Sequence, residues 1–426
     1  MNPKQIGSYK YYDYCRFCKS KKISSVIDLG YVPLAGGFLK NINKESLTKE
    51  FFYPLTLSFC QNCYLLQTSN VINKDILFKN YYYNSSSIKT LVNHFENVTE
   101  ELLRHLPQNI KPFIVEIGSN DGTLIKSSLS KGVKTLGIDP ATNIVRPLMK
   151  QKLPIINDYF TEKLAVRIKK RYGQADIIFS SNTLAHIENM HDVARGIKIL
   201  LKKNGMLIFE THYLGKLIKE LQYDMIYHEH QYYYSLTTLK KFFKMHQMEI
   251  FDVKPIQIHA GSMRYYVQNI NGGRKITNSV IKLEKREKNM KLDKKNTFIL
   301  YQKKVEKTKK RLITFLTSLK KRGHEIIGYG ASGRGSIIMN YCGLDSNNLS
   351  YIVDDAPAKQ KLYTPGNHLR VYPPKKIYKN QVSYILLFAW SFSKEIISKH
   401  QLYIQSGGKF IIPLPRVRLL SKNEKK

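Results

Sequence analysis

The sequence predicts an α/β protein with a central, mostly parallel sheet, a small metal-binding module before it and a second α/β domain after it. Three observations lead to this fold class. Four of the five cysteines form two Cys-x-x-Cys pairs within the first 63 residues. Short apolar runs alternate with helical patterns from residue 112 to about residue 272. A comparable alternation returns from residue 324 onward.

Length and composition set the scale of the molecule. With 426 residues, 42% of them apolar, the chain is long enough for two or three cores. No stretch approaches the run of about eighteen apolar residues that a membrane-spanning helix needs, and no hydrophobic leader opens the sequence. We therefore expect a cytoplasmic, monomeric protein that does not enter a membrane.

The formal net charge of +37 comes mostly from lysines spread along the whole chain. Nucleic-acid binders usually gather their basic residues in one patch or stripe. The even spread therefore disfavours nucleic-acid binding, and attraction of a small phosphorylated substrate accounts for the charge equally well.

The first predicted module, residues 1–75, is organised by Cys15, Cys18, Cys60 and Cys63. Each pair forms a tight turn that presents two thiolates to one ion, and four thiolates complete the closed shell of structural Zn²⁺. The 41 residues between the pairs predict a small subdomain between the knuckles. We expect neither a catalytic metal, because the shell is closed, nor a redox role, because no thioredoxin-like context is present.

The second predicted domain, residues 76–275, begins with a helical lead-in over residues 76–110. Apolar residues recur there at helical spacing: Leu91, Phe95, Val98, Leu102 and Leu106. The strand-like runs FIVEIG, TLGID, IIN, DIIFSSN and MLIFET follow, with helical segments between them, and predict a mostly parallel sheet. The closely spaced runs EIFDV and MRYYVQN predict an antiparallel hairpin at one edge.

A loop suited to close ligand approach follows the first of these strands. The run VEIGSNDG places Gly118 and Gly122 at a strand-to-helix turn, where glycine lets the backbone come close to a ligand. The next strand ends in Asp139, whose carboxylate is placed to accept hydrogen bonds from both hydroxyls of a ribose. The pattern E-x-G-x-x-x-G differs from the G-x-G-x-x-G of dinucleotide sites.

This loop resembles the first motif of class I S-adenosylmethionine-dependent methyltransferases. The resemblance implies cofactor contacts for Glu116, Gly118, Asn120, Asp121, Asp139, Asp158 and Asn182. Asp158 falls where that family contacts the adenine, and Asn182 ends the fourth strand-like run, beside the transferred methyl group. The expected cofactor is S-adenosylmethionine, and a cofactor-free α/β domain is the alternative.

Four consecutive titratable residues, Tyr227 to His230, follow the fifth strand-like run. Core packing does not require this density of polar groups. Next to a methyl donor, the cluster predicts a base that makes a carbon or oxygen nucleophilic. A surface helix start with two exposed histidines is the alternative.

The remaining chain predicts a connector and a third domain. Residues 276–322 carry an apolar repeat typical of one or two amphipathic helices: Phe298, Tyr301, Val305, Leu312, Phe315 and Leu319. Residues 323–426 predict a Rossmann-like domain, in which Gly328 to Gly333 matches G-x-G-x-x-G and Asp354 and Asp355 end the next strand. Taken alone, this loop predicts a phosphate cradle with Arg334 nearby, and NAD is one candidate ligand.

In their order along the chain, these motifs resemble the zinc-containing sugar C-methyltransferases that act on nucleotide-linked keto-deoxysugars. The resemblance covers nearly the whole length, including Asp28–Gly30, Pro33–Gly36, Tyr81–Ser86, VEIGSNDG, Asn182–His186, YHEH, His259–Ser262 with Arg264, and Tyr329–Gly335. It implies a C-terminal domain that helps to hold the sugar nucleotide, or whose glycine loop is architectural. Ala260 departs from the two glycines that relatives tend to carry after the histidine.

The resemblance implies catalytic roles for five residues: His230, Glu229, Tyr227, His186 and Tyr81. His230 matches the general base, which Tyr227 and Glu229 support. Tyr82 and Tyr83 offer alternative registers for Tyr81. His186 is otherwise a core or helix-cap histidine, and His228 receives no role.

The chemistry can also be argued without the resemblance. A C–H bond beside a ketone becomes acidic when the developing enolate oxygen is stabilised. A neutral His230 can take the proton, because the imidazole pKa lies near working pH. Tyr81, Tyr227 or His186 can donate to the enolate oxygen, and Glu229 can orient an imidazole.

Three alternatives stay open. An RNA methyltransferase with a zinc module suits the basic charge. The fourth strand, however, lacks the proline-rich motif of base-N methylation. C5 methylation of pyrimidines uses a nucleophilic cysteine, and Cys342 lies in the other domain. A non-enzymatic zinc-stabilised scaffold is disfavoured by the intact YHEH and VEIGSNDG runs. An enzyme of the same class could instead methylate a sugar hydroxyl or amine.

Overall fold

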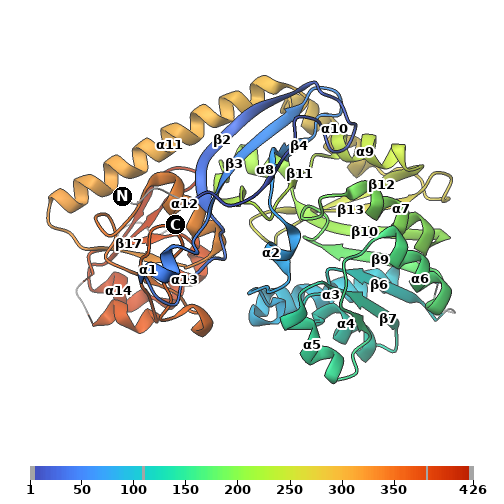
Figure 1. Ribbon diagram of the computed structural model, residues 1–426, viewed down its shortest axis with the longest axis horizontal. Coiled ribbons are helices and arrows are strands. Elements are labelled where there is room, and N and C mark those ends of the chain that lie inside the picture. The colour runs from blue at the N-terminus through green and yellow to red at the C-terminus, as the bar shows by residue number, and fades with distance from the viewer. Residues whose placement is uncertain (1–4, 108–110, 380–381, 422–426) are drawn as a thin grey trace.

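The computed structural model describes residues 5–107, 111–379 and 382–421 (Figure 1). The ends of the predicted modules that fall on residues 1–4, 108–110 and 422–426, and residues 380–381 of the last domain, lie outside the described residues. The described chain forms a central domain, a C-terminal domain and an N-terminal module that contacts both.

A seven-stranded sheet forms the core of the central domain, in the order β12-β13-β10-β9-β6-β7-β8. Its strands are β6 (Phe113–Ile117), β7 (Lys134–Ile138), β8 (Ile155–Ile156), β9 (Ala175–Ser181), β10 (Leu201–His212), β12 (Met248–Ile256) and β13 (Ser262–Asn269). Strands β8, β7, β6, β9 and β10 run parallel, which explains their nearly continuous apolar runs, since helices cover both faces. The predicted antiparallel hairpin is confirmed as β12–β13, with β13 paired to β10.

Helices connect these strands: α4 (Thr123–Ser130), α5 (Thr142–Lys150), α6 (Glu162–Tyr172), α7 (Met190–Leu200), α8 (Leu214–Lys219) and α9 (Leu236–Met245). The lead-in is helical mainly in α3 (Lys89–Arg104), preceded by the short α2 (Lys74–Phe78) and the 3₁₀ helix η1 (Ser85–Ser87). The prediction of one helical stretch from residue 76 is therefore wrong. Side chains of the central domain take the backbone hydrogen bonds of residues 81–86 instead: Asn143, Asn120 and Asp121.

The N-terminal module is built on a long hairpin of β2 (Ile23–Pro33) and β3 (Phe52–Cys60). Strand β4 (Leu66–Thr68) pairs with β3, and β11 (Tyr232–Tyr233) of the central domain adds to β4. Small elements complete the module: β1 (Lys10–Tyr11), β5 (Asn70–Val71) and α1 (Lys44–Leu47). Figure 1 shows the hairpin running below α11 from the central domain to the C-terminal domain.

Two helices join the domains, α10 (Asn278–Asn289) and α11 (Lys295–Lys321). The apolar repeat of α11 faces the core as expected except at its end, where Leu316 is buried and Phe315 is only partly buried. The C-terminal sheet has the order β16-β15-β14-β17-β18-β19. Its strands are β14 (Ile326–Tyr329), β15 (Ile352–Val353), β16 (Val371–Tyr372), β17 (Tyr384–Leu387), β18 (Lys409–Ile412) and β19 (Arg418–Leu420), and its helices are α12 (Gly333–Cys342), α13 (Ser393–Lys399) and α14 (Gln401–Gln405).

Candidate functional site

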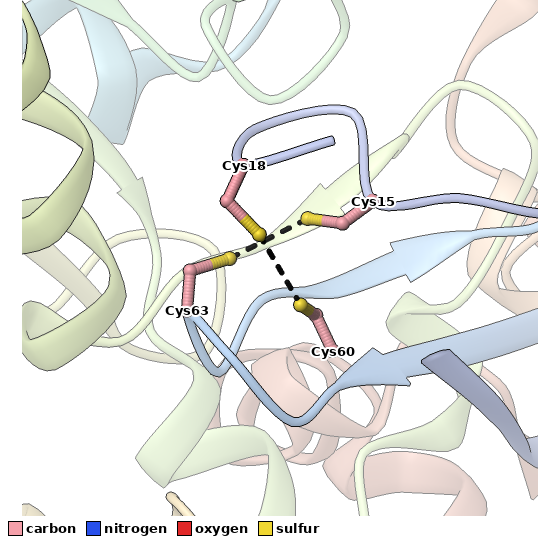
Figure 2. A group of neighbouring side chains, drawn as sticks. All are labelled: Cys15, Cys18, Cys60 and Cys63. Carbon is pink, nitrogen blue, oxygen red and sulfur yellow. Dashed lines mark hydrogen bonds between the residues drawn. The ribbon is translucent and has the colours of Figure 1, made fainter. Parts of the chain in front are cut away.

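Four cysteine sulfurs meet where the two knuckles face each other (Figure 2). The sulfurs lie within 4.8 Å of one another, and Cys15 Sγ is 3.4 Å from Cys63 Sγ. Cys15, Cys60 and Cys63 are buried. Four thiolates packed this closely away from water need a cation to balance their charge. The donor set therefore fits a structural Zn²⁺ ion with a closed shell.

Gly118 lies where β6 turns toward α4, at the carboxyl edge of the central sheet. Its φ is +77°, and a Cβ atom there would lie 1.9 Å from Thr183 Oγ1. Only glycine therefore fits against Thr183, which follows β9, in this backbone conformation. Glu116 is buried with Oε2 unpaired, and burial raises its pKa well above the usual range. A glycine turn beside an unpaired buried acid suits a ligand that carries amino or hydroxyl donors.

The other predicted cofactor residues lie along the same part of the sheet. Asp139 directly follows β7, and its carboxylate accepts hydrogen bonds from Asn120 N and Ala141 N, both at 2.8 Å. Asp121 is buried and accepts from Thr123 Oγ1 at 2.7 Å. Asp158 is exposed just beyond β8. The structure thus brings these groups to one edge and leaves Asp158 at its rim.

Asn182 follows β9, where a buried polar network fixes the backbone. Asn182 N donates to Glu210 O at 2.8 Å, and the Glu210 carboxylate accepts from Ser181 Oγ at 2.9 Å. Arg264 Nε also donates to this carboxylate at 2.9 Å, and His94 Nε2 lies 2.9 Å from it. Burial favours the protonated acid, but His94 and Arg264 outweigh it and lower the pKa of Glu210. Arg264 therefore supports the end of β9 from within the fold.

The YHEH segment runs between the 3₁₀ helix η2 (Tyr223–Met225) and β11. His228 and His230 are buried, so the alternative of a surface helix with exposed histidines is wrong. His228 meets the ring of Tyr53 on β3 edge-on, with the ring centroids 5.7 Å apart. His228 therefore belongs to the contact with the N-terminal module.

The backbone fixes the tautomer of His230. Its Nδ1 lies 2.8 Å from Met225 O, so this nitrogen carries the proton and Nε2 keeps its lone pair. The ring centroid lies 4.0 Å from that of Tyr227 and 5.1 Å from that of His186. Burial lowers the pKa of His230 to about 4, so the ring is neutral at neutral pH. His230 thus offers an unprotonated nitrogen.

Glu229 and Tyr81 form a polar pair in the same cluster. Tyr81 Oη donates to Glu229 Oε2 at 3.0 Å. Burial raises the pKa of Glu229 to about 7, and the hydrogen bond from Tyr81 opposes this rise. Burial and the Glu229 charge raise the pKa of Tyr81 well above its usual range, so its hydroxyl stays protonated. Tyr82 is 82% exposed, so of these two neighbouring tyrosines Tyr81 is the better placed to contact a substrate beside Glu229.

His186 completes the group of five predicted catalytic residues. Its ring stacks on Phe78 and on His230, with centroid distances of 5.6 Å and 5.1 Å. Nε2 has no hydrogen-bond partner, and burial lowers the pKa of His186 well below its usual range. The structure thus links Tyr81 to Glu229, and His230 to Tyr227 and His186.

No motif singled out His212, and His259 belongs to the predicted His259–Ser262 motif but received no role there. His212 ends β10 and is buried, and neither ring nitrogen has a hydrogen-bond partner. His259 opens a run of three residues with φ of 49°, 64° and 111°, a strained backbone of the kind that clusters at functional sites. His212 could have been predicted as a site residue, because it is a polar residue at the end of an apolar strand.

The C-terminal glycine loop is occupied by contacts within the protein. Ala331 N donates to Asp354 Oδ2 at 2.7 Å, as Asn120 N does to Asp139 in the central domain. A Cβ atom on Gly333 would lie 3.3 Å from Ala35 Cβ of the N-terminal module. Arg334 Nη2 lies 2.7 Å from Oδ2 of the buried Asp224. These contacts tie the loop to the N-terminal module and to η2.

The sheet order, the glycine loop and the acid that ends the second strand together define a class I S-adenosylmethionine-dependent methyltransferase. Three family models match in tandem, described as "Putative zinc binding domain" (residues 15–78), "Methyltransferase domain" (92–252) and "C-methyltransferase C-terminal domain" (257–415). The chain is 27% identical over 409 residues to the C-methyltransferase NovU of Streptomyces niveus, a similarity that covers 96% of this chain and 97% of that protein. The chain is an S-adenosylmethionine-dependent methyltransferase with a zinc-binding domain, and it is similar to a C-methyltransferase over nearly its whole length.

Solved structures resemble part of the chain more weakly. Magnesium protoporphyrin IX methyltransferase (ChlM) from Synechocystis PCC 6803 is 14% identical, with a TM-score of 0.32, over 42% of this chain and 82% of that one. A SAM-dependent methyltransferase from Archaeoglobus fulgidus is 17% identical, with a TM-score of 0.31, over 38% and 71%. Within the described ranges, no helix combines the length and apolarity that crossing a bilayer requires.

Proposed function

We propose that the enzyme methylates a carbon of a nucleotide-linked keto-deoxysugar, with His230 as the base that removes the proton beside the ketone. The observation that carries the proposal is the hydrogen bond between His230 Nδ1 and Met225 O, which leaves a neutral Nε2 lone pair. The net charge of +37 suits a substrate that carries a diphosphate.

The residues of the cluster divide the work. His230 Nε2 accepts the proton, and the C–H electron pair moves to form an enolate on the ketone oxygen. Tyr227 is the candidate donor to that oxygen, since burial raises its pKa and keeps it protonated. The single hydroxyl proton of Tyr81 is donated to Glu229, and this pair lines the same site. S-adenosylmethionine, held by the Gly118 loop and Asp139, supplies an electrophilic methyl group. Orientation of the enolate carbon toward that group accounts for much of the remaining rate gain.

Methyl-labelled S-adenosylmethionine tests this proposal against its alternatives. The enzyme is incubated with a panel of nucleotide-linked 4-keto sugars and with tRNA, and the labelled atom is located by NMR. Label on a sugar carbon supports the proposal. Label on a sugar oxygen or nitrogen would contradict proton removal from carbon, and label in RNA without any in sugar would overturn the substrate class.

A further inference from the structure

The first zinc knuckle contacts the residue that follows His230. Arg16 lies between Cys15 and Cys18 and is 4% exposed. Its Nη1 donates to Gln231 Oε1 at 2.8 Å, and its Nη2 donates to Gln231 O at 2.8 Å. The guanidinium therefore grips both the side chain and the backbone of Gln231. A lysine, with a single point charge, does not reproduce this planar two-point contact.

Gln231 passes the contact on to the second histidine of the cluster. Its Nε2 donates to His186 O at 2.9 Å, and its backbone N donates to Ala185 O at 2.9 Å. Gln231 is 1% exposed, so none of these bonds competes with bulk water. One residue thus joins the chain segments that carry His186 and His230.

The guanidinium is held on further sides. Arg16 Nη2 donates to Thr68 O at 3.0 Å, and the Arg16 backbone N donates to Gln67 Oε1 at 2.9 Å. The ring of Tyr232 lies 4.5 Å from Arg16 Cζ. The turn that carries Arg16 is closed by the cysteines on either side, so binding of the structural metal orders it. A knuckle that is fixed by its metal therefore also fixes the position of Gln231 through Arg16.

We infer that Arg16 is a positioning residue for methyl transfer, which acts through Gln231 to set the relative placement of His230 and His186. The inference rests on the proposed role of His230 as the base. Arg16 is neither a metal ligand nor part of the glycine loop that faces the cofactor. Its loss should therefore displace the two rings while zinc and cofactor binding persist. A misplacement of about 1 Å is enough to lower turnover by about 10²-fold.

The kinetic test compares Arg16→Met and Arg16→Lys with Lys21→Met, which alters an exposed lysine of the same module. Zinc content by metal analysis and S-adenosylmethionine affinity by calorimetry should match the wild type in all three full-length proteins. At saturating substrates, kcat should fall about 10- to 100-fold in Arg16→Met, recover little in Arg16→Lys and stay unchanged in Lys21→Met. Wild-type kcat in zinc-loaded Arg16→Met would overturn the inference.

Gln231→Met provides a second route if Arg16→Met does not retain zinc. It removes the acceptor of the Arg16 contact and should produce a similar loss of kcat. The kcat of the double variant Arg16→Met/Gln231→Met should be no lower than that of the less active single variant, because the two residues act as one unit. Losses that multiply independently would contradict this coupling.

Histidine NMR separates positioning from stability without any acceptor substrate. In zinc-loaded protein with S-adenosylmethionine, the ring Cε1–H signals of His230 and His186 should shift in Arg16→Met, whereas that of His94 should not. Unmoved signals would overturn the inference. Shifted signals together with wild-type turnover in His230→Ala would refute the proposed base and leave the positioning role of Arg16 supported.

Discussion

At the scale of single residues, His230 and Glu229 change protonation in different pH ranges. The pKa of His230, about 4, leaves its ring neutral throughout ordinary working conditions. The pKa of Glu229, about 7, places its change of charge within them. Any pH dependence of activity near neutrality should therefore come from Glu229.

We predict that kcat/KM falls as the pH drops through about 7, because Glu229 is ionised above its raised pKa and protonated below it. Protonation weakens its ability to accept from Tyr81 and to hold that hydroxyl in place. Glu229→Gln should have lower activity with a flat profile across this range. A limb near pH 7 that persists in Glu229→Gln pH–rate profiles would contradict the assignment.

Gly118 gives a second prediction at this scale. Gly118→Ala should lower S-adenosylmethionine affinity by about tenfold or more, because its Cβ would collide with Thr183 at the cofactor loop. Gly132→Ala is the matched control, since Gly132 has a φ of +71° but no atom within 4 Å of an added Cβ. Calorimetric titration should show wild-type affinity in the control. Wild-type affinity in Gly118→Ala would show that the contact with Thr183 does not matter for cofactor binding.

At the scale of elements, the sequence predicted what local patterns encode. Strands form where apolar runs predicted them, in β6, β7, β9, β10 and the β12–β13 hairpin. A buried strand needs apolar side chains at consecutive positions, so a short stretch of sequence is enough to predict it. The prediction of a continuous helix was wrong before residue 89, because the backbone there forms hydrogen bonds with side chains that are distant in sequence. The Arg16–Gln231 contact was invisible for the same reason, as its partners are 215 positions apart.

The ion pair between α12 and η2 gives a prediction about elements. Asp224 is fully buried and depends on Arg334 for charge compensation. Arg334→Met should destabilise the fold by about 3–5 kcal/mol, because it leaves that buried acid without its cationic partner, although the hydrogen bond from Trp390 Nε1 remains. Thermal unfolding should show a mild effect for Arg416→Met, an exposed arginine of the same domain, and partial recovery in Arg334→Met/Asp224→Asn. A decrease in Tm no larger than that of Arg416→Met would refute the role of the pair.

At the scale of the whole molecule, the N-terminal module connects the two larger domains. Its strand β4 pairs with β11 of the central domain, and its Glu50 lies 2.7 Å from His368 of the C-terminal domain. The order of motifs predicted the family and its metal and cofactor. It could not show that the residues between the cysteine pairs form a hairpin reaching from one domain to the other, since that depends on packing between distant segments.

Zinc removal should therefore affect more than the module. Cys15, Cys60 and Cys63 share an apolar core with strands and helices of the central domain. We predict that chelation lowers the Tm and weakens S-adenosylmethionine binding together, since structural Zn²⁺ contributes about 10–16 kcal/mol to folding in small zinc modules. Differential scanning calorimetry with metal analysis checks this. Unchanged melting of demonstrably metal-free protein would contradict a structural role.

The central claim, that His230 removes a proton from carbon, is tested most directly by solvent exchange. The keto-sugar acceptor is incubated in D₂O with enzyme and S-adenosylhomocysteine, and deuterium uptake beside the ketone is followed by NMR. The wild type should catalyse exchange, and His230→Ala should be slower by about 10²- to 10⁴-fold with unchanged affinity for the cofactor product. Exchange at the wild-type rate in His230→Ala would contradict the claim.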